Sequence, residues 1–254
     1  MSESILITGA GSGIGAGLAR QLAGDKRVIV VSDVNLEAAE EVTAEISQAG
    51  YEAHAMSLDV TDENDLDALA KCADEYQLDV LINNAGVQHV APLEDFDAER
   101  FRLLVDVLLN GAAMCCKAVL PVMRRKGSGR IINIGSVHSL VASPYKSAYV
   151  AAKHGLLGLS KVLALELADV DVTVNTVCPG YVDTPLVRAQ VADQARHHGM
   201  DPSDVIERIM LSSTPKRNWI SIEELTAAVS FLASPLARNI TGQTLVIDGG
   251  WTAQ

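Results

Sequence analysis

The chain has 254 residues and a formal net charge of −12, from 32 acidic and 20 basic side chains. This excess of acidic residues argues against nucleic acid or an anionic membrane surface as a partner. Hydrophobic residues make up 48% of the sequence and aromatic residues only 4%, which indicates a sizeable core of aliphatic side chains.

The N-terminus and the cysteines limit the class of protein further. Residues 1–4 hold no basic region ahead of an apolar one, and no apolar run reaches the ~18 residues that a membrane span needs. We therefore expect no secretory signal, no membrane partner and a cytoplasmic location. The cysteines form no CxxC pair and have no ligand-like spacing to histidine, so we expect neither disulfides nor a metal site; they are Cys72, Cys115, Cys116 and Cys178.

Short apolar runs alternate with stretches of helical character along the chain. The apolar runs predict strands at residues 4–8, 28–31, 51–58, 80–82, 130–134, 172–177 and 244–247. The stretches between them predict helices through residues 18–22 and over 36–46, 62–75, 98–124 and 221–232, and a helix that carries Tyr149 and runs to about residue 167. Thr61 or Asp62 is a candidate cap of the 62–75 helix.

This regular alternation means βαβ units with right-handed crossovers. No linker, repeat or low-complexity segment interrupts the pattern. We therefore predict one α/β domain over residues 1–254, a Rossmann-like doubly wound parallel sheet of about seven strands with helices on both faces. Residues 184–217 are less regular, and we expect them to form a lid over a substrate. The alternative is a surface excursion that packs between subunits.

A glycine-rich turn directly follows the first predicted strand. Gly9, Gly13 and Gly15 do not match the common G-x-G-x-x-G spacing, but they meet the same physical demand. A turn without Cβ atoms lets the backbone approach a pyrophosphate at the N-terminus of the next helix. A glycine-rich turn without a ligand is the alternative. The position of the turn after the first strand favours nucleotide binding.

Carboxylates end the next two predicted strands. Asp33 ends the second strand, where it can accept hydrogen bonds from the adenosine ribose and repel a 2′-phosphate. Neither Ser12 nor Val34 offers the cation that such a phosphate needs, so we predict NAD rather than NADP. Asp59 ends the third strand, where its carboxylate can meet the adenine amino group. Residues 83–86 end the fourth strand and border the same crevice.

Tyr149 and Lys153 lie four residues apart, which puts them on one face of a helix. A phenol has a pKa near 10, and a neighbouring ammonium favours its ionised form. Ser136 follows an apolar strand and can hydrogen-bond a substrate oxygen. These residues predict acid–base chemistry on an alcohol. A Tyr and a Lys at this spacing are common by themselves, so the prediction depends on the rest of the chain.

The motifs occur in the order typical of the short-chain dehydrogenase/reductase family, which the chain resembles over essentially its whole length. They are Thr8-Gly-x-x-x-Gly13-Ile14-Gly15, Asn83-Asn84-Ala85-Gly86, Asn110, Ser136, Tyr149-x-x-x-Lys153 and Pro179-Gly180. The resemblance implies that Tyr149 is the general base. It implies that Lys153 binds the nicotinamide ribose and lowers the tyrosine pKa, that Ser136 orients the reacting oxygen, and that Asn110 supports a water-linked proton path.

The turn, the strand ends and the resemblance together give the predicted cofactor-binding residues. They are Gly9, Ser12, Gly13, Ile14, Asp33, Asp59, Val60, Asn84, Ala85, Gly86, Tyr149, Lys153, Pro179, Gly180, Val182 and Thr184.

A narrower set of segments resembles members of the family that act on short 3-hydroxy acids; these are residues 87–92, 136–138, 146–155, 184–187 and 248–254. The resemblance implies that Gln88, His138, Lys146 and Gln190 hold a substrate carboxylate, while Ser136 and Tyr149 meet its hydroxyl group. A solvated surface Lys146 and a Gln190 that faces water are the alternatives. Tyr181 and Asp183 depart from the pattern, although Tyr181 can still pack on a substrate methyl group.

We therefore expect NAD-dependent oxidation of a small 3-hydroxy acid such as (R)-3-hydroxybutyrate to its 3-oxo acid. The alternatives are another alcohol, sugar, steroid or 3-oxoacyl oxidoreductase, and a non-catalytic NAD-binding regulator. Helix faces rich in Leu, Val and Ala around residues 149–167 suggest oligomerisation, and the resemblance implies a homotetramer. We predict no metal site. Some members of the family carry a divalent cation near the carboxyl end of the chain, and Gln254 leaves that alternative open.

Overall fold

The computed structural model describes residues 3–184, 187–188, 191, 195–196 and 199–253. In this part of the chain, seven strands form one parallel sheet in the order β3-β2-β1-β4-β5-β6-β7. The strands are β1 (Glu3–Thr8), β2 (Arg27–Asp33), β3 (Glu52–Ser57), β4 (Val80–Asn83), β5 (Ser128–Ile134), β6 (Asp171–Pro179) and β7 (Thr244–Ile247). The predicted seven-stranded, Rossmann-like α/β fold is confirmed.

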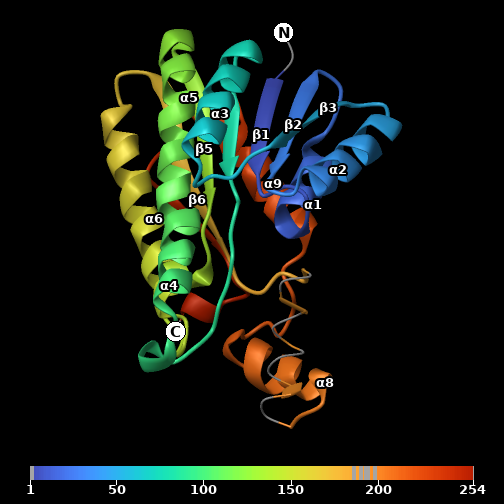
Figure 1. The fold of residues 1–254 in the computed structure, drawn as a ribbon, viewed down its shortest axis with the longest axis vertical. Coiled ribbons are helices and arrows are strands. Elements are labelled where there is room, and N and C mark those ends of the chain that lie inside the picture. Colours follow the sequence, from blue (N-terminus) through green and yellow to red (C-terminus); the bar gives the residue numbers. More distant parts are fainter. Residues whose placement is uncertain (1–2, 185–186, 189–190, 192–194, 197–198, 254) are drawn as a thin grey trace.

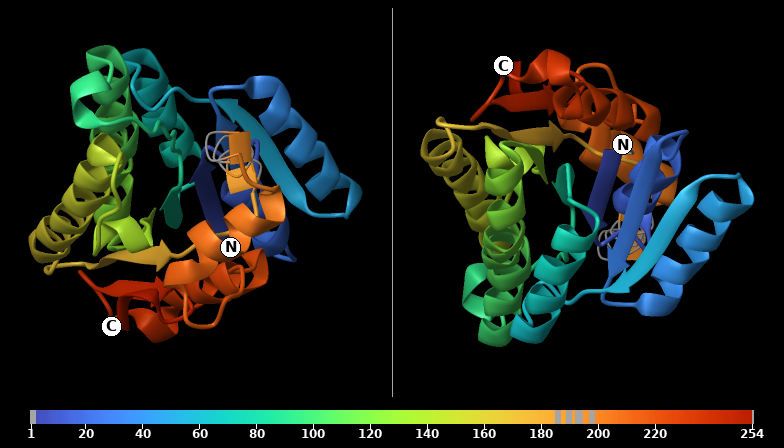
Figure 2. Two further views of the ribbon diagram at one scale, coloured as in Figure 1. Left: turned by 90° about the horizontal axis from the view of Figure 1, so that it is seen from below. Right: turned by 90° about the horizontal axis from the view of Figure 1, so that it is seen from above.

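Helices cover both faces of this sheet (Figures 1 and 2). One face packs against α1 (Gly13–Leu22), α2 (Leu36–Gln48) and α9 (Ile222–Ala233); the other packs against α3 (Glu63–Glu75), α5 (Ala112–Lys126) and α6 (Ser147–Glu166). Strand residues alternate between the two cores because successive side chains point to opposite faces. Ile5 and Ile7 join the first core, whereas Leu6 between them joins the second.

The predicted helix at 98–124 is a continuous helix with an irregular turn inside it. It comprises α4 (Ala98–Val105), a π-helical turn (Asp106–Gly111) and α5. By length and composition this helix could cross a membrane, although polar residues interrupt its apolar stretches. It packs against α3, α6 and the sheet instead, as a core helix of a Rossmann-like fold does.

The carboxyl ends of the strands point toward the end of the molecule from which the segment with α8 (Pro202–Val205) projects (Figure 1). Its described part holds α8, a π-helical turn (Ile206–Met210) and a 3-10 turn (Leu211–Ser213). It has a small apolar cluster of its own, in which Val205 and Met210 pack beside Tyr181 and Trp219. The role of this segment as a lid stays a prediction.

Local signals decide the other boundaries. Asp62, rather than Thr61, caps α3, because its side chain accepts hydrogen bonds from the backbone of Asn64 and Asp65. Short 3-10 turns leave no periodic pattern in the sequence; they span Leu93–Asp95, Val137–Ser139, Pro235–Ala237 and Trp251–Ala253.

All four cysteines are free, and Cys115, Cys116 and Cys178 are buried. Among the described residues, no group of three or more His, Cys, Asp or Glu side chains gathers to hold a metal ion.

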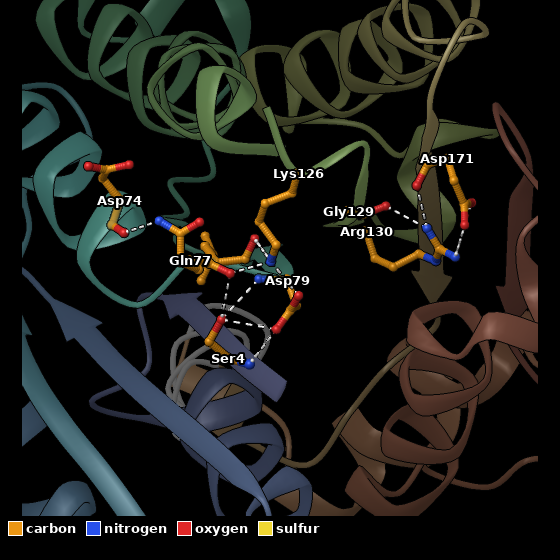
Figure 3. Close-up of polar contacts among 9 residues, drawn as sticks. Ser4, Asp74, Gln77, Asp79, Lys126, Gly129, Arg130 and Asp171 are labelled. Carbon is orange, nitrogen blue, oxygen red and sulfur yellow. Dashed lines mark hydrogen bonds and ion pairs between the residues drawn. The ribbon is translucent and has the colours of Figure 1, made fainter. Parts of the chain in front are cut away.

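Charged side chains connect the elements at the edge of the sheet where the strands have their amino ends (Figure 3). The Lys126 ammonium at the end of α5 pairs with the Asp79 carboxylate and donates to the carbonyls of Gln77 and Leu78. Asp79 in turn accepts a hydrogen bond of 2.9 Å from the Ser4 backbone in β1. These contacts hold the start of β1, the residue before β4 and the end of α5 together.

Replacing Arg130 tests whether contacts at the amino ends of the strands stabilise the fold. Its guanidinium is buried and donates hydrogen bonds of 2.8 Å to the carbonyls of Gly129 and Asp171. Replacing Arg130 with alanine should lower the free energy of unfolding by about 2–3 kcal/mol, because buried acceptors lose their donor. The matched change at the exposed Arg124, which pairs with Asp169, should cost less than about 1 kcal/mol. Urea denaturation followed by circular dichroism measures both; equal losses would contradict the structural role of Arg130.

Candidate active site

In the turn after β1, Gly9 and Gly15 lie too close to other atoms to carry a side chain. A Cβ atom on Gly9, whose φ is +63°, would lie 2.7 Å from the Cα atom of Ala85. A Cβ atom on Gly15 would lie 2.4 Å from the carbonyl oxygen of Gly9. These approaches leave an open cradle of backbone at the start of α1, which is the environment that a pyrophosphate needs.

The residues that follow β4 support this turn by hydrogen bonds. The side-chain amide of Asn84 donates hydrogen bonds of 2.9 Å to the carbonyls of Thr8 and Gly9. The Thr8 hydroxyl oxygen accepts hydrogen bonds of 3.0 Å from the backbone of Asn84 and Ala85. The side chain of Asn84 is therefore occupied in supporting the turn.

A cavity of about 500 Å³ runs along the carboxyl ends of the strands. The predicted cofactor residues that line it are Gly9, Ser12, Gly13, Ile14, Asp33, Asp59, Val60, Asn84, Ala85, Gly86, Tyr149, Lys153 and Thr184. Pro179, Gly180 and Val182 line a second, adjoining pocket. The elongated crevice and its glycine cradle fit a dinucleotide cofactor.

The second pocket has a volume of about 110 Å³ and brings together most of the predicted substrate residues. Gln88, Ser136, His138, Lys146 and Tyr149 all line it. Four residues line both this pocket and the crevice, namely Ile14, Gly135, Tyr149 and Thr184. The phenol of Tyr149 therefore stands at the junction of the two spaces. Gln190, the remaining predicted substrate residue, lies outside the described residues.

Tyr149 and Lys153 lie on the same side of α6; Lys153 is buried, whereas Tyr149 is half-buried and lines both cavities. The Lys153 ammonium donates a hydrogen bond of 2.6 Å to the carbonyl of Ile134 and lies 5.8 Å from the centre of the Tyr149 ring. Burial raises the pKa of Tyr149, while a hydrogen bond with Ser136 lowers it. Burial also lowers the pKa of Lys153 to about 8.

The expected lowering of the Tyr149 pKa by Lys153 stays a prediction, because burial is the largest influence on this phenol and raises its pKa. Desolvation of the phenolate outweighs the favourable contacts, so the tyrosine is protonated at neutral pH. In this form it can donate a proton to a ketone. The phenolate that oxidation of an alcohol requires becomes more populated as pH rises.

Lys146 is a buried cation, with only 6% of the residue exposed. Its ammonium contacts Nε2 of His138 at 3.4 Å and lies 5.7 Å from the centre of the Tyr181 ring. Burial and the neighbouring Lys146 lower the pKa of His138 to about 4, so the imidazole is neutral at pH 7. In the part of the chain that the structure describes, no carboxylate pairs with Lys146. The alternative of a solvated surface lysine is wrong, and the pocket wall offers a positive charge to a small anion.

The structure does not bring Asn110 to this cluster. Its side chain is exposed and donates a hydrogen bond of 2.7 Å to the Asp106 carboxylate. Residues two apart on a helix do not face the same way, and Leu108 is the residue that lines the crevice here. The π-helical turn therefore presents an apolar side chain toward Lys153 where an amide was expected.

The sequence prediction missed Trp251 as a pocket residue. Its ring centre lies 5.6 Å from that of His138 and 5.5 Å from that of Tyr181. Both Trp251 and Tyr181 line the pocket, so they form its aromatic wall. The available signal was position, because Trp251 follows β7 by four residues and parallel strands end at one edge.

Comparison with known proteins agrees with this geometry. The family described as enoyl-(acyl carrier protein) reductase matches residues 9–252. The chain belongs to the short-chain dehydrogenase/reductase family. Members of this family bind a nicotinamide cofactor at the Rossmann turn, and the protein is an oxidoreductase of the short-chain dehydrogenase class.

Several short-chain dehydrogenases match over the whole chain. A D-beta-hydroxybutyrate dehydrogenase of Rhizobium meliloti (strain 1021) is 44% identical over 259 residues, which cover 100% of both proteins. The uncharacterized oxidoreductase YxjF of Bacillus subtilis (strain 168) is 43% identical over 251 residues, 98% of each. Among solved structures, a single-residue variant of actinorhodin polyketide ketoreductase with NADPH is 32% identical with a TM-score of 0.94, covering 100% of this chain and 98% of that one.

Proposed function

We propose that this short-chain dehydrogenase oxidises (R)-3-hydroxybutyrate to acetoacetate with NAD, in a reversible reaction. The observation that carries the proposal is the buried Lys146 in the pocket beside Tyr149, with which no carboxylate of the described residues pairs. A buried cation without an ionic partner needs an anion, and a hydroxy acid supplies one beside its reacting alcohol. The similarity to a D-beta-hydroxybutyrate dehydrogenase supports the same substrate.

The size of the pocket favours a short acid. Its volume of about 110 Å³ suits a chain of a few carbons, whereas drug-sized ligands occupy about 300–1,000 Å³. Gln88 and Lys146 would bind the carboxylate, together with His138 and, by resemblance, Gln190. The backbone of His89 donates to the side-chain oxygen of Gln88, which frees the amide nitrogen for the substrate. Trp251 and Tyr181 would enclose the apolar end.

The glycine turn, Asp33 and Lys153 would hold NAD in the crevice. When bound, NAD supplies the carbon that accepts the hydride from the substrate. Tyr149 as phenolate removes the hydroxyl proton, and Ser136 hydrogen-bonds the same oxygen. Lys153 carries a positive charge at pH 7 that stabilises the phenolate once the nicotinamide end of the crevice is filled. We assign no step to Asn110, since its side chain is exposed.

We propose NAD rather than NADP because of Asp33. Its carboxylate lines the crevice at the end of β2, where a 2′-phosphate would meet a negative charge. The neighbouring Val34 is exposed and offers no compensating cation.

We also propose a cytoplasmic homotetramer. Apolar side chains are exposed on α6, at Val162 and Leu165, and near α9, at Phe231 and Leu236. Two separate apolar faces suit a tetramer with two kinds of two-fold interface. Light scattering coupled to size-exclusion chromatography measures the assembly.

A substrate panel with the purified protein tests the function. Reduction of NAD should be fastest with (R)-3-hydroxybutyrate and much slower with its S enantiomer, with a secondary alcohol of the same length, and with a 3-hydroxyacyl thioester. Faster turnover of any of these three would replace the proposed substrate. Tight binding of NAD without turnover of any member of the panel would indicate a regulator.

A further inference from the structure

We propose that Gly11 determines the preference for NAD over NADP by fixing the position of the Asp33 carboxylate. The inference rests on the proposed use of NAD. It concerns a residue that does not line the crevice itself, so Gly11 acts through Asp33 as a positioning residue.

The reason for a glycine at position 11 differs from that at its neighbours in the turn. Gly9 and Gly13 have φ values of +63° and +56°, a backbone conformation that other residues rarely adopt. Gly11 is not among the glycines with positive φ. Backbone conformation therefore does not require glycine here, and the close approach of other atoms does.

Two consecutive backbone groups join the turn to the end of β2. The Ala10 N–H donates to the carbonyl of Ser32 at 2.8 Å, and the Gly11 N–H donates to Oδ2 of Asp33 at 2.9 Å. The other carboxylate oxygen accepts the N–H of Asn35 at 3.0 Å. Both oxygens of Asp33 are thus anchored, and their remaining lone pairs are held in a defined orientation beside the crevice.

A Cβ atom on Gly11 would disrupt this arrangement. It would lie 2.8 Å from the Cβ atom of Ala38 and 3.0 Å from both Cγ and Oδ2 of Asp33. Ala38 sits in the first turns of α2 and cannot move without the helix. Of the two neighbours only the Asp33 side chain can rotate, so we expect it to be displaced, together with the Gly11 backbone that the contact with Ala38 pushes away.

Displacement of the Asp33 carboxylate affects the binding of the adenosine ribose of the cofactor. A displaced carboxylate loses its hydrogen bonds to the vicinal ribose hydroxyls of NAD. The displacement also moves the negative charge that repels a 2′-phosphate. The affinity for NADP should therefore fall less than the affinity for NAD, or rise. Gly11→Ala should therefore narrow the preference for NAD, whereas general damage to the turn would weaken both cofactors equally.

The test is a double-mutant cycle on the whole chain, with dissociation constants for NAD and NADP measured by isothermal titration calorimetry. Gly11→Ala should reduce the NAD/NADP preference by about tenfold, the effect of losing about 1.4 kcal/mol. In an Asp33→Ala background the same change should alter the preference less than about twofold. The control Gly24→Ala should change neither constant, because its Cβ atom would meet no atom within 4 Å.

Thermal unfolding of each variant accompanies the titrations. If Gly11→Ala does not fold, Gly11→Ala with Ala38→Gly removes the contact with α2 and keeps the contact with Asp33; it should still lose the preference. An unchanged preference, an equal loss for both cofactors, or full additivity with Asp33→Ala would each overturn the inference. If Asp33→Ala itself leaves the preference unchanged, the proposed discrimination by Asp33 fails instead.

Discussion

Replacing Tyr149 with phenylalanine should lower kcat for oxidation of 3-hydroxybutyrate by about 10³-fold or more. The change removes the hydroxyl at the junction of the two cavities that is proposed to take the substrate proton, and general base catalysis contributes about 10²–10⁴-fold. NAD affinity should change little, because the ring remains. Steady-state kinetics and calorimetric titration with NAD measure the two quantities separately.

The pH profile gives a second measurement on the same residue. Because burial raises the pKa of Tyr149 above the usual value near 10, kcat/KM for oxidation in the wild type should increase with pH from about pH 7 and still be increasing at about pH 9. The residual rate of Tyr149→Phe should lack this rise. Tyr51→Phe, at a half-exposed tyrosine outside both cavities, is the matched control and should keep the wild-type rate. A wild-type rate for Tyr149→Phe would refute the mechanism.

Replacing Lys146 with methionine should raise KM for 3-hydroxybutyrate by about 30–100-fold. Methionine keeps much of the volume of the side chain but removes the charge that faces the substrate carboxylate, and a hydrogen bond between charged groups contributes about 1.5–3 kcal/mol. Since His138 has a pKa of about 4, it carries no charge at neutral pH to take over the role. Initial rates over a range of substrate concentrations measure the effect.

The carboxylate-free analogue 2-butanol separates charge recognition from a general defect. Lys146→Met should leave its kcat/KM unchanged or improved, since the alcohol brings no anion to the pocket. Lys161→Met, at an exposed lysine on the same helix, should alter neither substrate. Equal losses for the acid and the alcohol would show that Lys146 supports the structure of the site rather than the carboxylate.

The cofactor crevice was the most predictable part of the site. Its residues follow strands directly, at Gly9 after β1, Asp33 at the end of β2 and residues 83–86 at the end of β4. Parallel strands end at one edge of the sheet, so residues that are distant in sequence meet there without further information. The same rule applies to Trp251 after β7, yet one aromatic residue beyond a strand is a weak signal in the sequence.

Asn110 shows where a motif was insufficient. Asn110 is the residue that the motif predicts for the proton path, but direction on a helix changes by about 100° per residue. The π-helical turn and the hydrogen bond to Asp106 point it to solvent, and Leu108 faces the crevice. Sequence order alone cannot determine which of two residues so close together faces a neighbour.

The sequence by itself determined the order of strands and helices, the parallel sheet, the glycine cradle and the tyrosine–lysine pair, because each depends on local patterns or on short spacing. Only the tertiary structure decided the electrostatics. Burial raises the pKa of Tyr149 and lowers that of His138, and it leaves Lys146 as a charge without a carboxylate partner among the described residues of the pocket wall. Desolvation depends on atoms from every surrounding segment, and no local pattern in the chain records how closely those segments pack.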